Sequence, residues 1–170
     1  MIVVNLKRYG GYILIIYQFY TNVYKRANYE KDMKELYSKV KPGTLLHIIH
    51  KDEEEVKGRR CLISPEQFLQ LAVCDGLPKG HSFTGPHRHL PQQRSLDKTQ
   101  EAWVIIRGSV EVAMYDLDDS LLEKDILRPG DCYTYLEGGH GFTLLEENTR
   151  FYEIKNGPYN GQSKDKEFIR

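Results

Sequence analysis

From Thr44 onward, short apolar runs alternate with turn residues along the chain. The runs are rich in Val, Ile, Leu and aromatic residues, which favour β-strands, and Gly, Pro or Asp separates them. They comprise Leu45–Ile49, Phe68–Cys74, Ala102–Ile106, Val110–Tyr115, Leu121–Leu127, Cys132–Leu136 and Phe151–Lys155. Many short strands at regular spacing, with almost no helix between them, predict an antiparallel β-sandwich or barrel.

Specific turn residues mark where these predicted strands end. Gly108 and Ser109 separate two strands, and the polar stretch Asp116–Ser120 has the composition of a hairpin loop. Pro129–Asp131 is a further turn signal, and no repeat or low-complexity tract interrupts the pattern. We therefore expect one all-β domain, with a polar stretch from Asn156 onward that wraps around its outside.

The N-terminal part of the chain has a different character. Residues 1–30 are rich in Tyr and Ile and favour an extended conformation. Residues 30–39 predict a short helix, because Met33, Leu36 and Tyr37 are at helical spacing. The chain is accordingly divided into an N-terminal extension of strand and helix, residues 1–33, and a main domain, residues 34–170.

One apolar stretch in the extension, Tyr9–Tyr20, raises the question of a signal peptide or membrane anchor. Its continuous apolar run is far shorter than the ~18–20 residues that cross a bilayer. No small-residue cleavage site follows it. We expect a buried strand, or a strand that pairs with a second subunit of a homodimer, and no membrane association.

Charge and cysteine content narrow the functional classes. Lys plus Arg and Asp plus Glu both number 24, so the formal net charge is zero, and a basic excess typical of nucleic-acid binders is absent. The three cysteines, Cys61, Cys74 and Cys132, form no C-x-x-C pair. Each is expected to be a small core or wall residue without a disulfide, which fits a reduced, cytoplasmic setting.

Histidine and carboxylate residues supply candidate metal ligands. His87 and His89 are two residues apart, so on a strand both side chains point to the same face. Glu101 stands at the entrance of an apolar strand, where a buried carboxylate needs a partner. His140 follows Gly138 and Gly139, which allow a tight bend that turns its side chain inward. Three imidazoles and one carboxylate make a plausible metal site with room for a substrate.

Other residues near these positions are candidates for the wall of a pocket. Trp103 lies two residues after Glu101, so it shares its face and is either a pocket or a core residue. Tyr133 and Tyr135 share one face of a predicted strand and could add hydroxyl groups to the cavity. His47 lies within an apolar strand and is expected to be structural.

A charged pair is expected in the last predicted strand. Glu153 and Lys155 lie two residues apart and therefore on one face of that strand. Charges at this spacing typically form a cross-strand ion pair on the outside of a sheet.

These residues resemble the two sequence motifs of the cupin family. In the first motif, an H-x-H pair is followed by Glu and Gly, and His87, His89, Glu101 and Gly108 match. In the second, Gly130 and His140 match at a distance one residue short, and Leu136 stands where the motif has Pro. The resemblance implies a jelly-roll barrel, the double-stranded β-helix. It also implies that one divalent ion, Fe, Mn, Ni or Zn, is bound by His87, His89, Glu101 and His140.

The chain departs from the first motif in one respect. Eleven residues, Leu90–Gln100, lie between His89 and Glu101, where the motif has three or four. Gln92 or Gln93 is therefore an alternative to Glu101 as a ligand. The insertion would also form a longer lip over the mouth of the barrel.

Over residues 34–170 the chain is similar to small stand-alone bacterial cupins, which are often encoded beside genes for surface-polysaccharide or sugar-nucleotide synthesis. Pro86–His89, Gln100–Gly108, Gly138–His140 and Tyr152–Tyr159 are among the segments that carry this similarity. Family habit and the strand-like N-terminus imply a homodimer.

The similarity implies an isomerase-like or epimerase-like enzyme acting on a sugar, sugar nucleotide or related polar metabolite. The metal would act as a Lewis acid, and Glu101 or Tyr133 would move a proton. Two alternatives stay open: an Fe(II)-dependent dioxygenase and a non-catalytic ligand-binding cupin.

Overall fold

A computed structural model describes residues 6–9, 12–15, 33–52, 56–81 and 86–169 of the chain. The chain divides into two compact units, Met1–Lys31 and Asp32–Arg170. The first unit contains strands β1 (Leu6–Tyr9) and β2 (Tyr12–Ile15), which pair in an antiparallel hairpin. No helix in the described part of the chain is long and apolar enough to cross a membrane.

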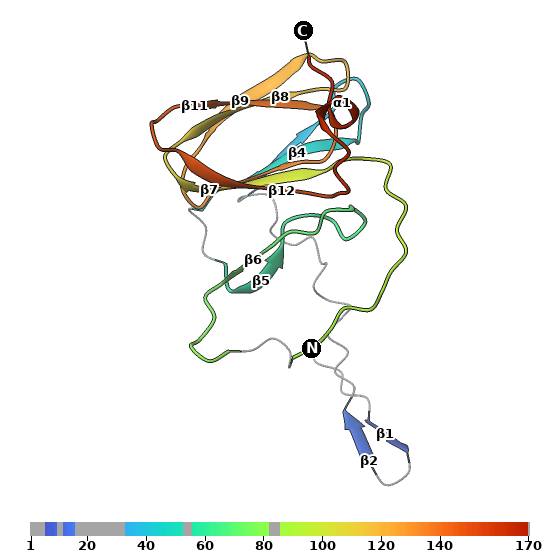
Figure 1. Ribbon diagram of the computed structural model, residues 1–170. Coiled ribbons are helices and arrows are strands. Elements are labelled where there is room, and N and C mark those ends of the chain that lie inside the picture. The colour runs from blue at the N-terminus through green and yellow to red at the C-terminus, as the bar shows by residue number, and fades with distance from the viewer. Residues whose placement is uncertain (1–5, 10–11, 16–32, 53–55, 82–85, 170) are drawn as a thin grey trace. The chain divides into compact units, whose positions relative to one another are not determined.

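The second unit is built around two antiparallel sheets that face each other (Figure 1). The larger sheet has the strand order β12-β7-β10-β4-β3. Its strands in chain order are β3 (Met33–Tyr37), β4 (Leu45–His50), β7 (Glu101–Arg107), β10 (Cys132–Tyr135) and β12 (Arg150–Lys155). Every neighbouring pair within this sheet is antiparallel.

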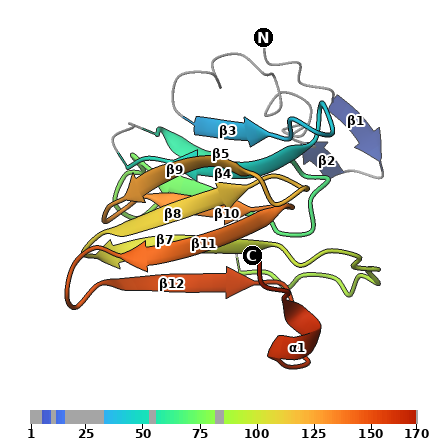
Figure 2. The same ribbon diagram turned by 90° about the horizontal axis from the view of Figure 1, so that it is seen from above.

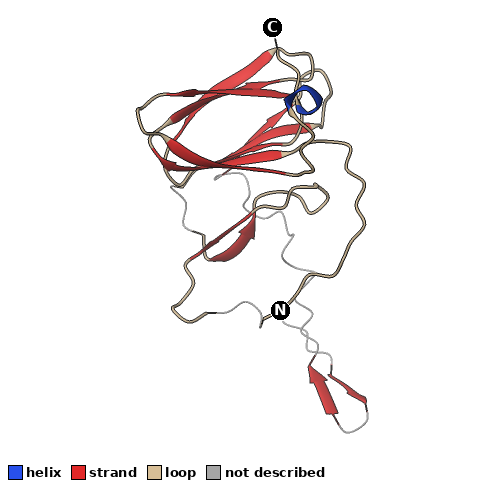
Figure 3. Ribbon diagram, viewed as in Figure 1, coloured by secondary structure: helices blue, strands red, loops and turns tan. Residues whose placement is uncertain are grey.

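The smaller sheet has the strand order β11-β8-β9 and is also antiparallel. It contains β8 (Val110–Tyr115), β9 (Leu121–Leu127) and β11 (Gly139–Leu144). The two layers are seen edge-on in Figure 3. The prediction of an all-β fold with antiparallel sheets is confirmed. Within the described residues the two sheets remain separate, so their strands do not close into one hydrogen-bonded barrel.

Alternating side chains explain why the two sheets pack together. In β8, Val110, Val112 and Met114 are fully buried, whereas the residues between them are partly exposed. These three pack with Trp103 and Ile105 of β7 in a single core cluster. Because successive side chains of a strand point to opposite faces, one apolar face of each sheet is enough to form this core.

A second apolar cluster lies against other residues of the larger sheet. A short hairpin, β5 (Gly58–Cys61) and β6 (Ala72–Asp75), leads into and out of a loop that contributes Leu62 and Ile63. These two side chains pack with Ile48 of β4. Gln100 also joins this loop to β7, because its Oε1 accepts a hydrogen bond of 2.9 Å from the backbone N–H of Leu69.

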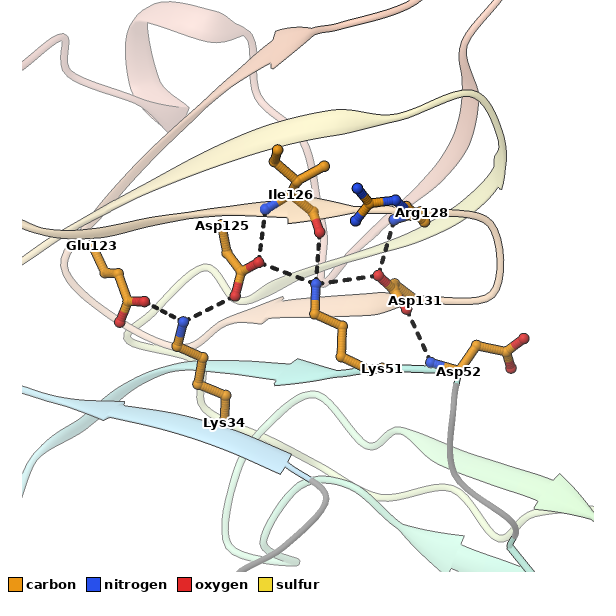
Figure 4. Close-up of polar contacts among 8 residues, drawn as sticks. All are labelled: Lys34, Lys51, Asp52, Glu123, Asp125, Ile126, Arg128 and Asp131. Carbon is orange, nitrogen blue, oxygen red and sulfur yellow. Dashed lines mark hydrogen bonds and ion pairs between the residues drawn. The ribbon is translucent and has the colours of Figure 1, made fainter.

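Charged side chains join the two sheets in what we call the ionic network: Lys34, Lys51, Glu123, Asp125 and Asp131 (Figure 4). Lys34 of β3 pairs with Glu123 and with Asp125 of β9, the latter at 2.9 Å. Lys51 lies 3.1 Å from Asp125 and 3.3 Å from Asp131. Lys34 therefore joins β3 to β9, and Lys51 joins β9 to the turn before β10.

The predicted helix over residues 30–39 is wrong where the structure describes it. Residues 33–37 form strand β3, which pairs with β4; residues 30–32 lie outside the described part. The reason is tertiary: β4 offers a row of backbone groups, and pairing with them outweighs a weak local helix preference. Leu36 is buried in the core on this strand.

Other local predictions also need correction. The strand expected around His87 and His89 is not formed, because residues 87–89 have no regular secondary structure. The strand expected over Phe68–Cys74 is confined to Ala72–Asp75. All three cysteines are free, and Cys74 is exposed rather than in the core or wall.

Candidate ligand-binding cavity

A cavity of about 850 Å³ opens among the strands of the second unit. Its lining residues come mainly from β7, β8, β10, β11 and β12, and from the C-terminal segment Asp165–Ile169. The short helix α1 (Gln162–Asp165) leads into that segment and lies at the end of the strands where β12 finishes (Figure 2). A volume of this size suits a small organic ligand.

Glu101 is the most buried carboxylate in the cavity lining, with 5% of the residue exposed. It begins β7, and Trp103 lies on the same face two residues later. The indole Nε1 of Trp103 donates a hydrogen bond to Glu101 Oε1. This bond fixes the orientation of the carboxylate and leaves its second oxygen, Oε2, directed elsewhere.

That second oxygen faces His140. Glu101 Oε2 and His140 Nε2 are 4.0 Å apart, which is too long for a direct hydrogen bond. One oxygen or nitrogen atom of a ligand or a water can lie about 2.8 Å from both. The pair can therefore hold a single polar atom between an acceptor and an imidazole nitrogen.

The local backbone explains how His140 reaches this position. Gly138 has a φ of 92°, and a Cβ there would lie 2.5 Å from the backbone oxygen of Tyr115. Only glycine fits, and the chain turns from β10 into β11 with His140 near the start of the strand. The glycine pair predicts the bend, but no pattern in the sequence predicts β11, which pairs along its whole length with β8.

Burial keeps the His140 imidazole neutral. Its ring packs between Tyr135 and Trp103, with ring centroids 4.4 and 5.1 Å away. Burial lowers its pKa to about 4; Lys166 and Lys155 add to this, and Glu153 opposes it. Its Nδ1 atom is buried and has no hydrogen-bond partner in the described part of the chain. At neutral pH the ring is neutral, so one of its nitrogens can donate a hydrogen bond to a bound ligand and the other can accept one.

Tyr133 and His47 form a buried pair next to this site. His47 Nε2 lies 3.0 Å from the backbone oxygen of Tyr115, so Nε2 donates that bond. The other nitrogen, Nδ1, then accepts from the Tyr133 hydroxyl at 2.9 Å. Burial lowers the pKa of His47 to about 4 and raises the pKa of Tyr133 well above its usual value. The hydroxyl predicted to move a proton is thus bonded to His47.

Tyr135 is the tyrosine of β10 that lines the cavity. Its hydroxyl donates a hydrogen bond of 2.9 Å to the backbone oxygen of Gly138, the residue that turns the chain toward His140. Burial raises its pKa, and Glu137 and Glu101 add to the increase. Tyr135 therefore remains protonated at neutral pH and stabilises the bend.

The C-terminal segment was expected to lie on the outside, but all five of its residues line the cavity. Two contacts hold it. Lys155 Nζ lies 2.7 Å from Asp165 Oδ2, and a Cβ on Gly139 would lie 2.2 Å from Ile169 Cδ1. The expected external ion pair between Glu153 and Lys155 is therefore corrected: Lys155 pairs with Asp165, and Glu153 lines the cavity.

The structure brings together two of the four predicted metal ligands. Glu101 and His140 face each other, whereas His87 and His89 are exposed and contact each other, with ring centroids 5.3 Å apart. Gln92 and Gln93, the alternative ligands, are also exposed.

Among the described residues, no group of three or more His, Cys, Asp or Glu is placed to hold a metal ion. Catalytic metal sites usually have at least three protein ligands. The donor set in this arrangement does not fit the predicted ion, and metal binding stays a prediction.

No family model, no curated protein and no solved structure matches the chain. The function is therefore inferred from the residues of the cavity itself.

Proposed function

We propose that the second unit is a cupin-type jelly roll. Its two facing sheets contain eight strands in all, the number typical of a jelly roll. The chain passes from one sheet to the other between β7 and β8, and it does so again at each step from β9 to β12. This repeated crossing, together with the motif residues around Glu101 and His140, supports the double-stranded β-helix topology.

We further propose that the cavity binds a small, polar, hydroxylated compound and that Glu101, with the help of His140, moves a proton within it. The observation that carries this proposal is the Glu101–His140 pair, a buried carboxylate and a half-buried imidazole 4.0 Å apart in a ligand-sized cavity. Trp103 and Tyr135 place flat apolar surfaces beside the pair, and such surfaces suit the C–H faces of a sugar ring.

The pair is suited to an isomerase-like or epimerase-like reaction. Trp103 orients the carboxylate, and the neutral imidazole can share a bound hydroxyl group with it, whose O–H donates to Glu101 Oε2. Glu101 would then remove a proton from the carbon next to a carbonyl and return it, while the neutral His140 would donate a hydrogen bond that stabilises the enolate oxygen. Each group acts from a fixed position, so little reorganisation is needed.

The resemblance to cupins encoded near surface-polysaccharide genes favours a sugar or sugar derivative as the ligand, and a cytoplasmic homodimer as the working form. A gel-filtration mass near the 19.8 kDa of one chain would contradict the dimer.

Solvent exchange tests the reaction. The protein is incubated in D2O with a panel of aldoses, ketoses and keto-sugar nucleotides, and proton NMR follows exchange at each carbon. We expect deuterium at one carbon of a bound sugar, and a loss of at least about 100-fold in the exchange rate in Glu101→Gln. Glu147→Gln is the matched control, because Glu147 is exposed in a turn. Binding without exchange would make the protein a non-catalytic binder, and no binding to any sugar would refute the proposal.

A further inference from the structure

We infer that the ligand of this cavity carries a positive charge, as an amine on a polar, hydroxylated frame such as an amino sugar. The inference rests on the proposed function, since it names the class of compound that the same cavity takes. Five carboxylates line the cavity, those of Glu101, Asp119, Glu153, Asp165 and Glu167, whereas Lys166 supplies the single ammonium group among the lining residues.

A further lysine near the site, Lys155, is already paired. Lys155 lies opposite Glu101 in the register of β12 and β7, so it is on the same face of the sheet. Its Nζ lies 2.7 Å from Asp165 Oδ2, and both side chains are largely buried, with 16% and 12% exposed. Lys155 therefore neutralises Asp165, and the other carboxylates still outnumber Lys166.

Glu101 contributes most to this excess of negative charge because it is the least exposed of the cavity carboxylates. Glu153, Asp119 and Glu167 are exposed, so solvent screens their charges. Glu101 Oε2 has no hydrogen-bond donor within bonding distance among the described residues, and His140 Nε2, its nearest imidazole nitrogen, is 4.0 Å away. This oxygen opens into the cavity, where it can accept a hydrogen bond from a ligand. An ammonium group of a ligand would supply both the donor and the opposite charge.

Aromatic rings next to these carboxylates support the same conclusion. Trp103 and Phe142 line the cavity with ring centroids 5.3 Å apart, and Tyr135 lines it beside His140. Aromatic faces attract cations, and they also stack on sugar rings. Carboxylates and aromatic rings together favour an amine, whereas a sugar phosphate or nucleotide diphosphate would face repulsion from the same carboxylates.

Three compounds on one hexose frame test the charge of the ligand: glucose, glucosamine and glucose 6-phosphate. Binding is measured by calorimetry at pH 7, at low ionic strength and with EDTA present. We expect glucosamine to bind about tenfold tighter than glucose, the gain of one hydrogen bond between charged groups. Glucose 6-phosphate should bind most weakly, and the preference for the amine should shrink as salt is added.

Variants that each remove one negative charge show whether the cavity carboxylates cause the preference for glucosamine. Glu153→Gln removes one cavity carboxylate at an exposed position, so the preference for glucosamine over glucose should fall. Glu147→Gln should leave this preference unchanged. Equal affinity for glucose and glucosamine, or tighter binding of the phosphate, would overturn the inference and leave the proposed function standing. No binding of any sugar would overturn both.

Discussion

Charged side chains are organised in opposite ways in two regions of the second unit. In the ionic network, carboxylates are matched by lysines and by backbone N–H groups (Figure 4). In the cavity, carboxylates outnumber ammonium groups, and Glu101 Oε2 faces a neutral imidazole. Paired charges join the two sheets, whereas unmatched charges are available to a ligand. The contrast predicts that one region serves stability and the other function.

The largest difference that we expect between the two regions is the pH range in which each loses its contribution to stability. The cavity region contains His47 and His140, whose pKa values burial lowers to about 4. In the unfolded chain these imidazoles bind protons below their ordinary pKa of about 6.5, whereas in the folded protein they do so only near pH 4. The free energy of unfolding should therefore fall as the pH drops from about 6.5 toward 4. Each imidazole contributes a slope of up to about 1.4 kcal/mol per pH unit.

The ionic network should respond only at lower pH. Burial acts to raise the pKa of Asp125, but hydrogen bonds and charges from Lys34 and Lys51 outweigh it, so the net shift is downward from 3.8. The stabilisation that the ionised Asp125 contributes is therefore complete above pH 3.8 and is lost at lower pH. Urea titrations from pH 7 to 3 measure both phases, and His140→Gln should remove part of the first. A flat free energy of unfolding between pH 6.5 and 5 would show that these imidazoles titrate normally.

Replacing a buried carboxylate by its amide should affect stability differently in the two regions, as Asp131→Asn and Glu101→Gln would show. Asp131 Oδ1 accepts from the N–H of Asp52, and Oδ2 accepts from the N–H of Arg128 and from Lys51. In Asp131→Asn, the amide nitrogen would face a donor whichever way it turned. We expect a loss of about 2–3 kcal/mol in the free energy of unfolding, measured by urea denaturation.

Glu101→Gln should have a much smaller effect on stability. Trp103 can still donate to the amide oxygen, and the change removes a buried charge whose second oxygen has no donor in the described part of the chain. We expect the free energy of unfolding at pH 7 to change by less than about 1 kcal/mol. A loss as large as that of Asp131→Asn would mean that Glu101 is a structural residue.

The part of the fold that could be predicted depends on local signals. The strands β8 and β9 match the predicted runs Val110–Tyr115 and Leu121–Leu127 residue for residue. Their alternating side chains and the turn between them lie close together in sequence, so pattern and turn chemistry specify them. Asp116 in that turn also accepts hydrogen bonds from Ser38 and Lys39, a long-range contact that no local pattern shows.

The parts that could not be predicted depend on distant partners. Residues 33–37 have helical spacing of apolar residues, yet they form a strand because β4 pairs with them. The strand β11 contains two glycines and carried no strand signal, but it pairs with β8. Likewise, the place of the C-terminal segment is set by Asp165 and Ile169, whose contacts with Lys155 and Gly139 cannot be inferred from the composition of a polar tail.

Metal ions should have the smallest effect on either region. The sequence motif groups four ligands, but the structure places Glu101 and His140 together and leaves His87 and His89 exposed in a loop. Two donors bind an ion more weakly than the three or four of a typical site. After incubation with Fe, Mn, Ni or Zn salts and dialysis, we expect substoichiometric metal by elemental analysis and no difference in His87→Ala. One metal ion per chain that is lost in His87→Ala would instead restore the four-ligand site, and it would require residues 87–89 to reach the cavity when metal is present.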